Sequence, residues 1–179
     1  HIKHVVITGG TRGLGLSHVM FLAQHGYDVS IIDISKSACR VYGELTSIDE
    51  LLAQLQSYGA KAHFFACDLT NLDSLKNCIA RIVDEAGDID AIVANVGGDV
   101  VGRDQCASGA KASNNSIEIS SEQHNEVFDR NYLTCFNTIK AIAPYFRQRK
   151  KGKIVTTTSI SAGYGVPQET AYAVAKSAV

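Results

Sequence analysis

The stretch Thr8-Gly9-Gly10-Thr11-Arg12-Gly13-Leu14-Gly15 decides how this chain folds. It follows a short β-rich run, His4–Thr8, and precedes a segment whose apolar residues recur at helical spacing up to Gly26. Glycines let a backbone approach a phosphate closely, and the helix N-terminus supplies free N–H groups and the positive end of a dipole. The context therefore favours a nucleotide-binding turn over a tight turn without a ligand. The candidate binding residues in it are Gly9, Thr11, Arg12, Gly13, Leu14 and Gly15.

Strands alternate with helices along the rest of the chain. Further strand-like runs lie at Val29–Ile32, Ala62–Cys67, Ala91–Ala94 and Lys153–Thr158, with helical patterns between them. Such alternation gives right-handed βαβ units and a parallel sheet. A complete dinucleotide-binding sheet has six strands, whereas this sequence shows five and stops within a helical pattern that begins near Thr170. We expect one doubly wound, Rossmann-like α/β domain over residues 1–179, with its C-terminal part missing from this chain.

Composition argues against several other classes of protein. The chain has 179 residues, of which 45% are hydrophobic and 20% charged, with a net charge of −1. These values are ordinary for a globular domain and provide no field that would attract nucleic acid or an anionic membrane. No apolar run approaches the roughly 18 residues of a membrane helix. Five scattered cysteines fit reduced thiols in a cytoplasmic protein better than a disulfide framework.

Two features bear on which nucleotide the turn would hold. Asp33 ends the second strand, about 20 residues past the glycines, where a carboxylate accepts hydrogen bonds from the adenosine ribose and repels a 2′-phosphate. That favours NAD over NADP, although a simple cap on the strand end is the alternative. Arg12 would instead favour NADP, because its guanidinium could reach a 2′-phosphate. Arg12 could equally be solvated or pair with Asp33.

Polar and glycine residues also follow the third and fourth strands. Asp68-Leu69 ends the third strand and could meet an adenine, or Asp68 could instead cap the turn before the next helix. Asn95-Val96-Gly97 ends the fourth strand. There the amide of Asn95 can tie neighbouring strands, and Gly97 lets the backbone pass close to a ligand.

A second group of residues is suited to catalysis rather than to cofactor binding. Tyr172 and Lys176 are four apart on an expected helix and so share a face. A nearby ammonium lowers the pKa of a phenol, which is about 10 when free, so the pair can act as a general acid or base. Ser159, just after the fifth strand, could hold a substrate oxygen against Tyr172. Asn131 lies within a long expected helix despite its low helix propensity, which suggests either a functional role or a solvent-facing position.

In combination these motifs resemble the short-chain dehydrogenase/reductase family, in the branch with a TGxxxGxG turn. The matching positions run in order: Thr8–Gly15, Asp33, Asp68, Asn95–Gly97, Asn131, Ser159, Tyr172 and Lys176. The resemblance implies NAD(H)-dependent interconversion of a secondary alcohol and a ketone, with Tyr172 as proton donor or acceptor and Ser159 holding the substrate oxygen. It also implies that Lys176 binds the nicotinamide ribose and lowers the Tyr172 pKa, and that Asn131 positions a water in a proton relay to Lys176.

The resemblance also implies a homodimer or homotetramer, packed through the helix bearing Tyr172 and the long helix at Ser120–Phe146. That long helix carries more apolar surface than one core-facing stripe requires, which by itself predicts a symmetric partner. No metal site is expected, since Asp104, Cys106 and His124 lack the spacing of known ligands.

Some positions depart from the family pattern or leave alternatives. Val96 stands where the family usually has alanine, and Val100–Ser116 looks like an insertion, expected to be a flexible loop near the substrate entrance. Ser161 is a second candidate for the role of Ser159, but its spacing to Tyr172 fits the family less well.

Two other functions are possible for this sequence. An NAD(H)-binding redox sensor would not need Ser159, Tyr172 and Lys176 together, and an extended-type sugar epimerase or dehydratase usually carries TGxxGxxG instead.

Overall fold

The structure is a computed structural model that describes residues 3–40, 43–99, 119–165, 167 and 169–179. Within these ranges five parallel strands form one sheet in the order β3-β2-β1-β4-β5. Their bounds are β1 His4–Thr8, β2 Asp28–Asp33, β3 Ala62–Ala66, β4 Ala91–Ala94 and β5 Lys153–Thr156. The chain builds outward from β1 to β3 and then crosses back to β4, so the strand order reverses between β1 and β4. The α/β doubly wound architecture predicted from the sequence is confirmed.

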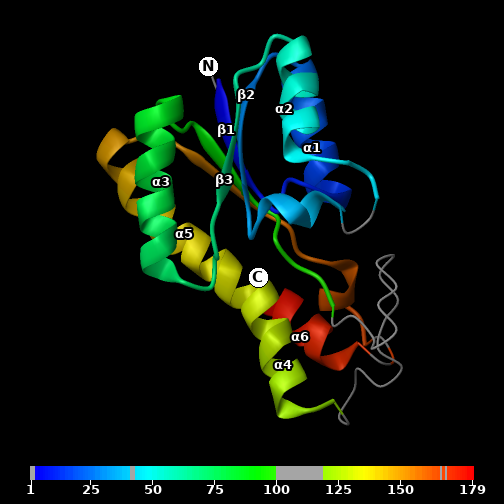
Figure 1. Cartoon of the computed structure of the whole chain (residues 1–179). Coiled ribbons are helices and arrows are strands. Elements are labelled where there is room, and N and C mark those ends of the chain that lie inside the picture. Colours follow the sequence, from blue (N-terminus) through cyan, green and yellow to red (C-terminus); the bar gives the residue numbers. More distant parts are fainter. Residues whose placement is uncertain (1–2, 41–42, 100–118, 166, 168) are drawn as a thin grey trace.

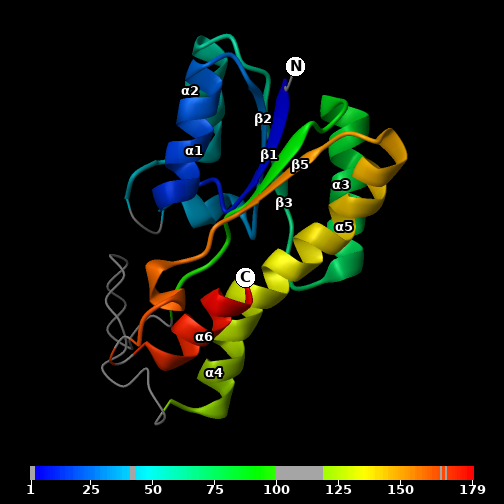
Figure 2. The same ribbon diagram turned by 180° about the vertical axis from the view of Figure 1, so that it is seen from behind.

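Helices cover both faces of this sheet (Figures 1 and 2). One face carries α1 (Gly13–Gln24) and α2 (Ile48–Ser57); the other carries α3 (Leu72–Ala86) and α5 (Thr134–Arg149). Two further helices, α4 (Ser121–Phe128) and α6 (Thr170–Ala178), lie beyond the carboxyl ends of the strands. None of the helices described here is long and apolar enough to cross a membrane.

Each face of the sheet has its own hydrophobic core. Val6 and Ile92 pack toward α3 and α5, whereas Ile7 and Ile31 pack toward α1 and α2, and all four are fully buried. A strand buried on both faces must be apolar at successive positions, which is why the strands appear as continuous hydrophobic runs.

Some element boundaries differ from the predicted ones. A π-helical turn, η2 (Asp129–Leu133), separates α4 from α5 where one continuous helix was expected. A 3-10 helix, η1 (Lys36–Arg40), follows β2, and β5 ends at Thr156 rather than at Thr158. Asn71 caps α3, because its side chain accepts a hydrogen bond from the Ser74 N–H at 2.9 Å. Ser47 caps α2 and Ser120 caps α4 in the same way. The Val100–Ser116 insertion lies outside the described residues.

The amino end of the sheet is held together by the buried carboxylate of Asp90. It accepts hydrogen bonds from the backbone N–H groups of Lys3 at 2.8 Å and His4 at 3.3 Å, and from Lys151 Nζ at 2.8 Å. Burial alone would raise the pKa of Asp90, but the hydrogen bonds from these three donors lower it to about 2. The carboxylate therefore joins the start of β1 to the turn before β5.

This arrangement predicts a specific loss of stability in acid. Because the folded pKa of Asp90 lies below its unfolded value, the stabilisation is present above about pH 4 and is lost as the pH falls towards 2. Asp90→Asn should lower the free energy of unfolding at pH 6 by about 1–2 kcal/mol, since Lys151 is half exposed and solvent screens its charge. Urea unfolding at pH 6 and pH 2.5 measures this. The exposed Asp73, in Asp73→Asn, is the control; an equal loss at both pH values would contradict the account.

Candidate active site

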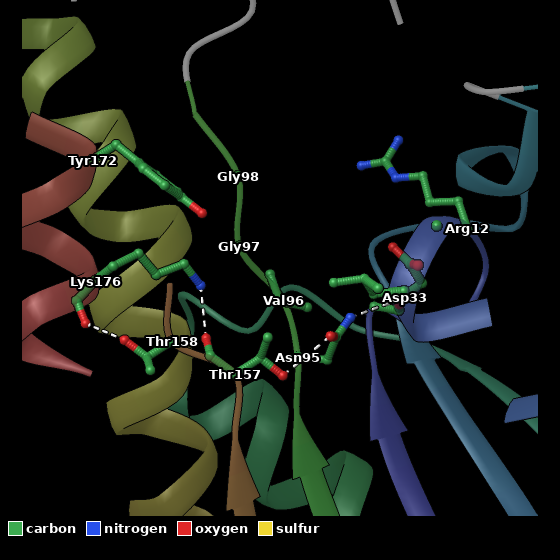
Figure 3. Close-up of a pocket in the computed structure, with 13 residues that line it drawn as sticks. Arg12, Asp33, Asn95, Val96, Gly97, Gly98, Thr157, Thr158, Tyr172 and Lys176 are labelled. Atoms are coloured by element: carbon green, nitrogen blue, oxygen red, sulfur yellow. Dashed lines mark hydrogen bonds between the residues drawn. The ribbon is translucent and has the colours of Figure 1, made fainter. Parts of the chain in front are cut away.

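A cavity of about 230 Å³ lies at the carboxyl ends of the strands, between the glycine turn and α6 (Figure 3). It occupies the point where the strand order reverses, which is where open α/β sheets bind ligands. Ten predicted site residues line it: Gly9, Arg12, Gly13, Leu14, Asp33, Asn95, Val96, Gly97, Tyr172 and Lys176. Gly98, Thr157 and Thr158 line it too and were not predicted. Gly98 follows β4 by four residues, and Thr157 and Thr158 directly follow β5, so their place at the carboxyl ends of these strands could have identified them.

The glycine turn brings backbone, rather than side chains, to the cavity. Gly9 adopts a φ of 67°, a conformation that favours glycine. A Cβ on Gly15 would lie 1.9 Å from the Gly9 carbonyl oxygen, so only glycine lets α1 approach the turn this closely. Arg12 is the N-cap of α1 but makes no side-chain cap, so its side chain does not occupy the first N–H groups of the helix, which are suited to an anion.

Asp33 closes one end of the cavity. Its side chain is buried, and Thr11, which is fully buried, donates its hydroxyl to Asp33 Oδ2 at 2.5 Å. The other carboxylate oxygen accepts the Ile34 N–H at 2.8 Å. Thr11 thus does not line the cavity but fixes the carboxylate that does. Figure 3 shows Arg12 at the same end of the cavity as Asp33.

The opposite end of the cavity is formed by α6. Lys176 is buried, and its Nζ donates to the Thr157 carbonyl at 2.8 Å and lies 6.0 Å from the centre of the Tyr172 ring. Burial lowers the pKa of the Lys176 ammonium, and the nearby Cys135 raises it in part. A Cβ on Gly97 would lie 2.5 Å from Lys176 Nζ, so the glycine makes room for the ammonium. Figure 3 shows Tyr172 and Lys176 directed into the same space.

Asn95 ties the strands together beneath the cavity, as the sequence predicted. Its Nδ2 donates to the Gly9 carbonyl at 3.5 Å, and its Oδ1 accepts from the Thr157 hydroxyl at 3.2 Å. Its backbone N–H donates to the Thr8 hydroxyl at 3.0 Å. The ends of β1, β4 and β5 are therefore held in one hydrogen-bonded cluster.

Asn131 lies behind the cavity in the π-helical turn and is fully buried. Its Oδ1 accepts the Gly98 N–H at 3.0 Å, while its Nδ2 donates to the carbonyls of Gly98 and Val127, both at 2.8 Å. The solvent-facing alternative is therefore wrong. π-Helical turns are frequent at functional sites, and this one lets an asparagine side chain hold the segment that follows β4.

The two candidate serines occupy different environments. Ser159 is half-buried before the 3-10 helix η3 (Ile160–Ala162), and its hydroxyl oxygen accepts the Ser161 N–H at 3.2 Å. Ser161 is buried, and its own hydroxyl donates to Glu169 Oε2 at 2.6 Å. Neither serine is among the residues that line the cavity.

Known proteins of one family are similar to this chain in sequence. A sequence model of the short-chain dehydrogenases matches residues 3–179. The chain belongs to the short-chain dehydrogenase family. Its sequence is 27% identical over 177 residues to the 3-oxoacyl-(acyl-carrier-protein) reductase FabG of Thermotoga maritima, covering 99% of this chain and 63% of that protein. It is 29% identical over 177 residues to a cyclopentanol dehydrogenase of Comamonas, covering 99% and 62%.

Solved structures show the same fold. The NADPH-dependent 3-quinuclidinone reductase from Rhodotorula rubra has a TM-score of 0.79 at 26% identity, with 98% of this chain and 60% of that chain covered. An NAD⁺-bound xylitol dehydrogenase has a TM-score of 0.79 at 22% identity, with the same coverage. This short-chain dehydrogenase sequence thus spans about three fifths of the length of the relatives it matches.

Two other predicted residues lie outside the cavity. Asp68 is exposed, and its Oδ1 accepts the N–H of Thr70 at 2.9 Å and the Thr70 hydroxyl at 2.7 Å, which is the turn-capping alternative. Leu69 is buried in the core beside α3. The described ranges contain no cluster of three or more potential metal ligands, and Asp104 and Cys106 lie outside those ranges.

A carboxylate that sequence analysis missed sits at the N-terminus of α1. The Gly13 N–H donates to Glu44 Oε2 at 2.8 Å, on the exposed side of the turn. Gly13 is the first residue of α1, so this N–H is one of the groups that a bound anion would use. A phosphate oxygen can accept this hydrogen bond only after the Glu44 carboxylate has left it.

Removing this internal anion should therefore strengthen binding of a dinucleotide. Glu44→Ala should lower the Kd for NADH about fivefold, since one exposed hydrogen bond of about 1 kcal/mol no longer has to be broken. Isothermal titration calorimetry on the full-length protein measures the change. Glu50, whose carboxylate instead binds Thr46, provides the control in Glu50→Ala. An unchanged or weaker affinity in Glu44→Ala would contradict the expectation.

Proposed function

We propose that this chain is the cofactor-binding and catalytic part of an NAD(H)-dependent oxidoreductase that interconverts a secondary alcohol and a ketone. The observation that carries the proposal is that one cavity joins the glycine turn, the Asp33 carboxylate and the Tyr172–Lys176 pair. The first two suit the adenosine and phosphates of a dinucleotide, and the pair suits proton transfer. Relatives named as a cyclopentanol dehydrogenase and a 3-oxoacyl reductase support the same class of reaction.

The residues present fit a nicotinamide dinucleotide. Once Glu44 has left the Gly13 N–H, the N-terminus of α1 offers N–H groups to the diphosphate, and Gly9 and Gly15 let the backbone come close to it. Thr11 fixes the Asp33 carboxylate, so its remaining lone pairs can accept the adenosine ribose hydroxyls. Since the same negative charge repels a 2′-phosphate, we propose NAD as the cofactor. Among the described residues that line the cavity, Arg12 is the one that would favour NADP.

The protein's part in the reaction is to move a proton and hold the reacting atoms. When bound, the cofactor supplies or accepts the hydride. In reduction the Tyr172 hydroxyl donates its proton to the ketone oxygen, and in oxidation the Tyr172 phenolate accepts the proton of the alcohol. The buried Lys176 ammonium stabilises the tyrosinate and holds the nicotinamide ribose. Ser159 donates a hydrogen bond to the substrate oxygen. Asn131 holds Gly98 from behind and, in this proposal, positions a water that relays protons to Lys176.

Removing the Tyr172 hydroxyl should separate catalysis from binding. Tyr172→Phe keeps the ring but deletes the proton path, so kcat should fall at least 100-fold while the Kd for NADH stays within about twofold. Stopped-flow absorbance of NADH measures kcat, and protein fluorescence measures Kd. Tyr164→Phe, at a tyrosine that is 72% exposed, is the matched control. If Tyr172→Phe kept more than a tenth of the wild-type kcat, another group would be the acid or base.

Asp33 should control the choice of cofactor. Asp33→Ala removes charge-assisted hydrogen bonds worth about 1.5–3 kcal/mol, so the Kd for NADH should rise roughly 10- to 150-fold. Binding of NADPH should weaken much less, because its 2′-phosphate no longer meets a negative charge. Asp28→Ala, at the opposite end of β2, is the control. An unchanged ratio of the two Kd values would instead assign the preference to Arg12.

We also propose that the protein forms a homodimer or homotetramer through α5 and the π-helical turn before it. Tyr132 and Phe136 are 38% and 44% exposed, and their rings stack with centres 5.9 Å apart. The Lys140 ammonium lies over the Phe136 ring, with its Nζ 5.5 Å from the ring centre. The two exposed rings support the second apolar stripe that the sequence predicted. The described cysteines, Cys39, Cys67, Cys78 and Cys135, are free thiols, which supports a cytoplasmic location.

A charge placed in this stripe should break the assembly. Phe136→Asp should convert the full-length protein to monomers at 10 µM or shift its dissociation constant at least tenfold, as measured by light scattering after gel filtration. Phe21→Asp places the same charge at an exposed aromatic residue of α1 and should leave the assembly intact. A wild-type protein that is monomeric at this concentration would refute the proposal.

A further inference from the structure

A buried hydrogen bond joins η3 to the start of α6 directly beside the candidate catalytic residues. Ser161 Oγ donates to Glu169 Oε2 at 2.6 Å, and the two residues are only 8% and 2% exposed. A carboxyl group is almost never this deeply buried unless it is paired, because leaving water is costly for it. Neither Ser161 nor Glu169 has a part in the proton and hydride transfer described above.

The bond controls the position of Ser159 through the Ser161 backbone. Ser159 Oγ accepts the Ser161 N–H at 3.2 Å. A serine hydroxyl has one proton and two lone pairs, so accepting this N–H leaves the Ser159 proton available for a substrate oxygen. The direction in which that proton points therefore depends on where Ser161 is held, and Ser161 is held by Glu169.

The same bond controls the position of Tyr172 through α6. Glu169 is the N-cap of α6, and its carbonyl accepts the Ala173 N–H at 2.7 Å. Tyr172 lies three residues beyond this cap, in the first turn of the helix. The far end of α6 is held separately, because Lys176 Nζ donates to the Thr157 carbonyl and the Thr158 hydroxyl donates to the Lys176 carbonyl. The Ser161–Glu169 bond thus fixes the end of α6 that bears Tyr172.

We propose that Ser161 and Glu169 are positioning residues that set the separation between the Ser159 and Tyr172 hydroxyls. The inference rests on the proposed function, in which both hydroxyls approach the same substrate oxygen. They come from different segments, and the Ser161–Glu169 bond links those segments through one short chain of contacts. A displacement of about 1 Å between groups that must converge on one atom can reduce a rate about 100-fold.

The experiment compares three variants of the full-length protein with cyclopentanol and other secondary alcohols. Ser161→Ala removes one buried oxygen atom and should lower kcat at least tenfold, with the Kd for NADH unchanged within twofold. Glu169→Gln keeps an acceptor oxygen for Ser161 and should retain kcat within about threefold. Ser177→Ala is the matched control, because it removes another side-chain bond between α6 and η3, from Ser177 Oγ to the Ala162 carbonyl at 2.9 Å. It should leave kcat within twofold of wild type.

The outcomes separate this proposal from the proposed function. Wild-type kcat in Ser161→Ala, or equal losses in Ser161→Ala and Ser177→Ala, would overturn the positioning role alone. So would a loss in Glu169→Gln as large as that in Ser161→Ala. Wild-type protein that binds NADH but oxidises none of the alcohols would contradict the proposed function and the positioning role together. A melting temperature for each variant confirms that the comparison is made between folded proteins.

Discussion

The candidate site depends on the burial of one cation, the Lys176 ammonium. An ammonium loses much of its hydration when buried, and its lowered pKa reflects that cost. The Thr157 carbonyl at the end of β5 compensates in part by accepting its hydrogen bond, and Gly97 at the end of β4 leaves the space it fills. These contacts dock α6 onto the carboxyl edge of the sheet and place Tyr172 opposite the glycine turn. An alanine at Gly97 or a shift of β5 would therefore disturb the ammonium and the phenol together.

The two halves of the chain contribute different functions to the cavity. The part from β1 to β3 supplies the glycine turn and the Asp33 carboxylate, both suited to anchoring a nucleotide. The part after β4 supplies the π-helical turn, the Ser159 segment and α6, which are suited to proton transfer. Asn95 lies between them and binds both sides, through the Gly9 carbonyl and the Thr157 hydroxyl. The chain covers 62–63% of the length of the curated relatives compared above.

Much of this could be predicted from the sequence, because the decisive features are local. Buried parallel strands must be apolar at successive positions, and a turn that brings backbone to a phosphate needs glycine at fixed spacing, so β1, Gly9 and Gly15 stand out in the sequence. Asp33 was identified by its distance from the glycines, and Lys176 by its spacing of four residues from Tyr172 on one helix. The Ser161–Glu169 bond and the Glu44 contact could not be identified in this way, because each joins residues whose approach depends on how separate elements pack. Asp68 was given two roles from the sequence, and its bonds to Thr70 match turn capping.

The most direct test of the account is a crystal structure of the full-length protein with NADH. We expect the adenosine ribose hydroxyls to lie within hydrogen-bonding distance of the Asp33 carboxylate. The diphosphate should lie at the N-terminus of α1 with Glu44 displaced from the Gly13 N–H, and the nicotinamide ribose should contact Lys176 Nζ. A dinucleotide bound in the reverse direction, or bound away from the cavity between the glycine turn and α6, would contradict the account.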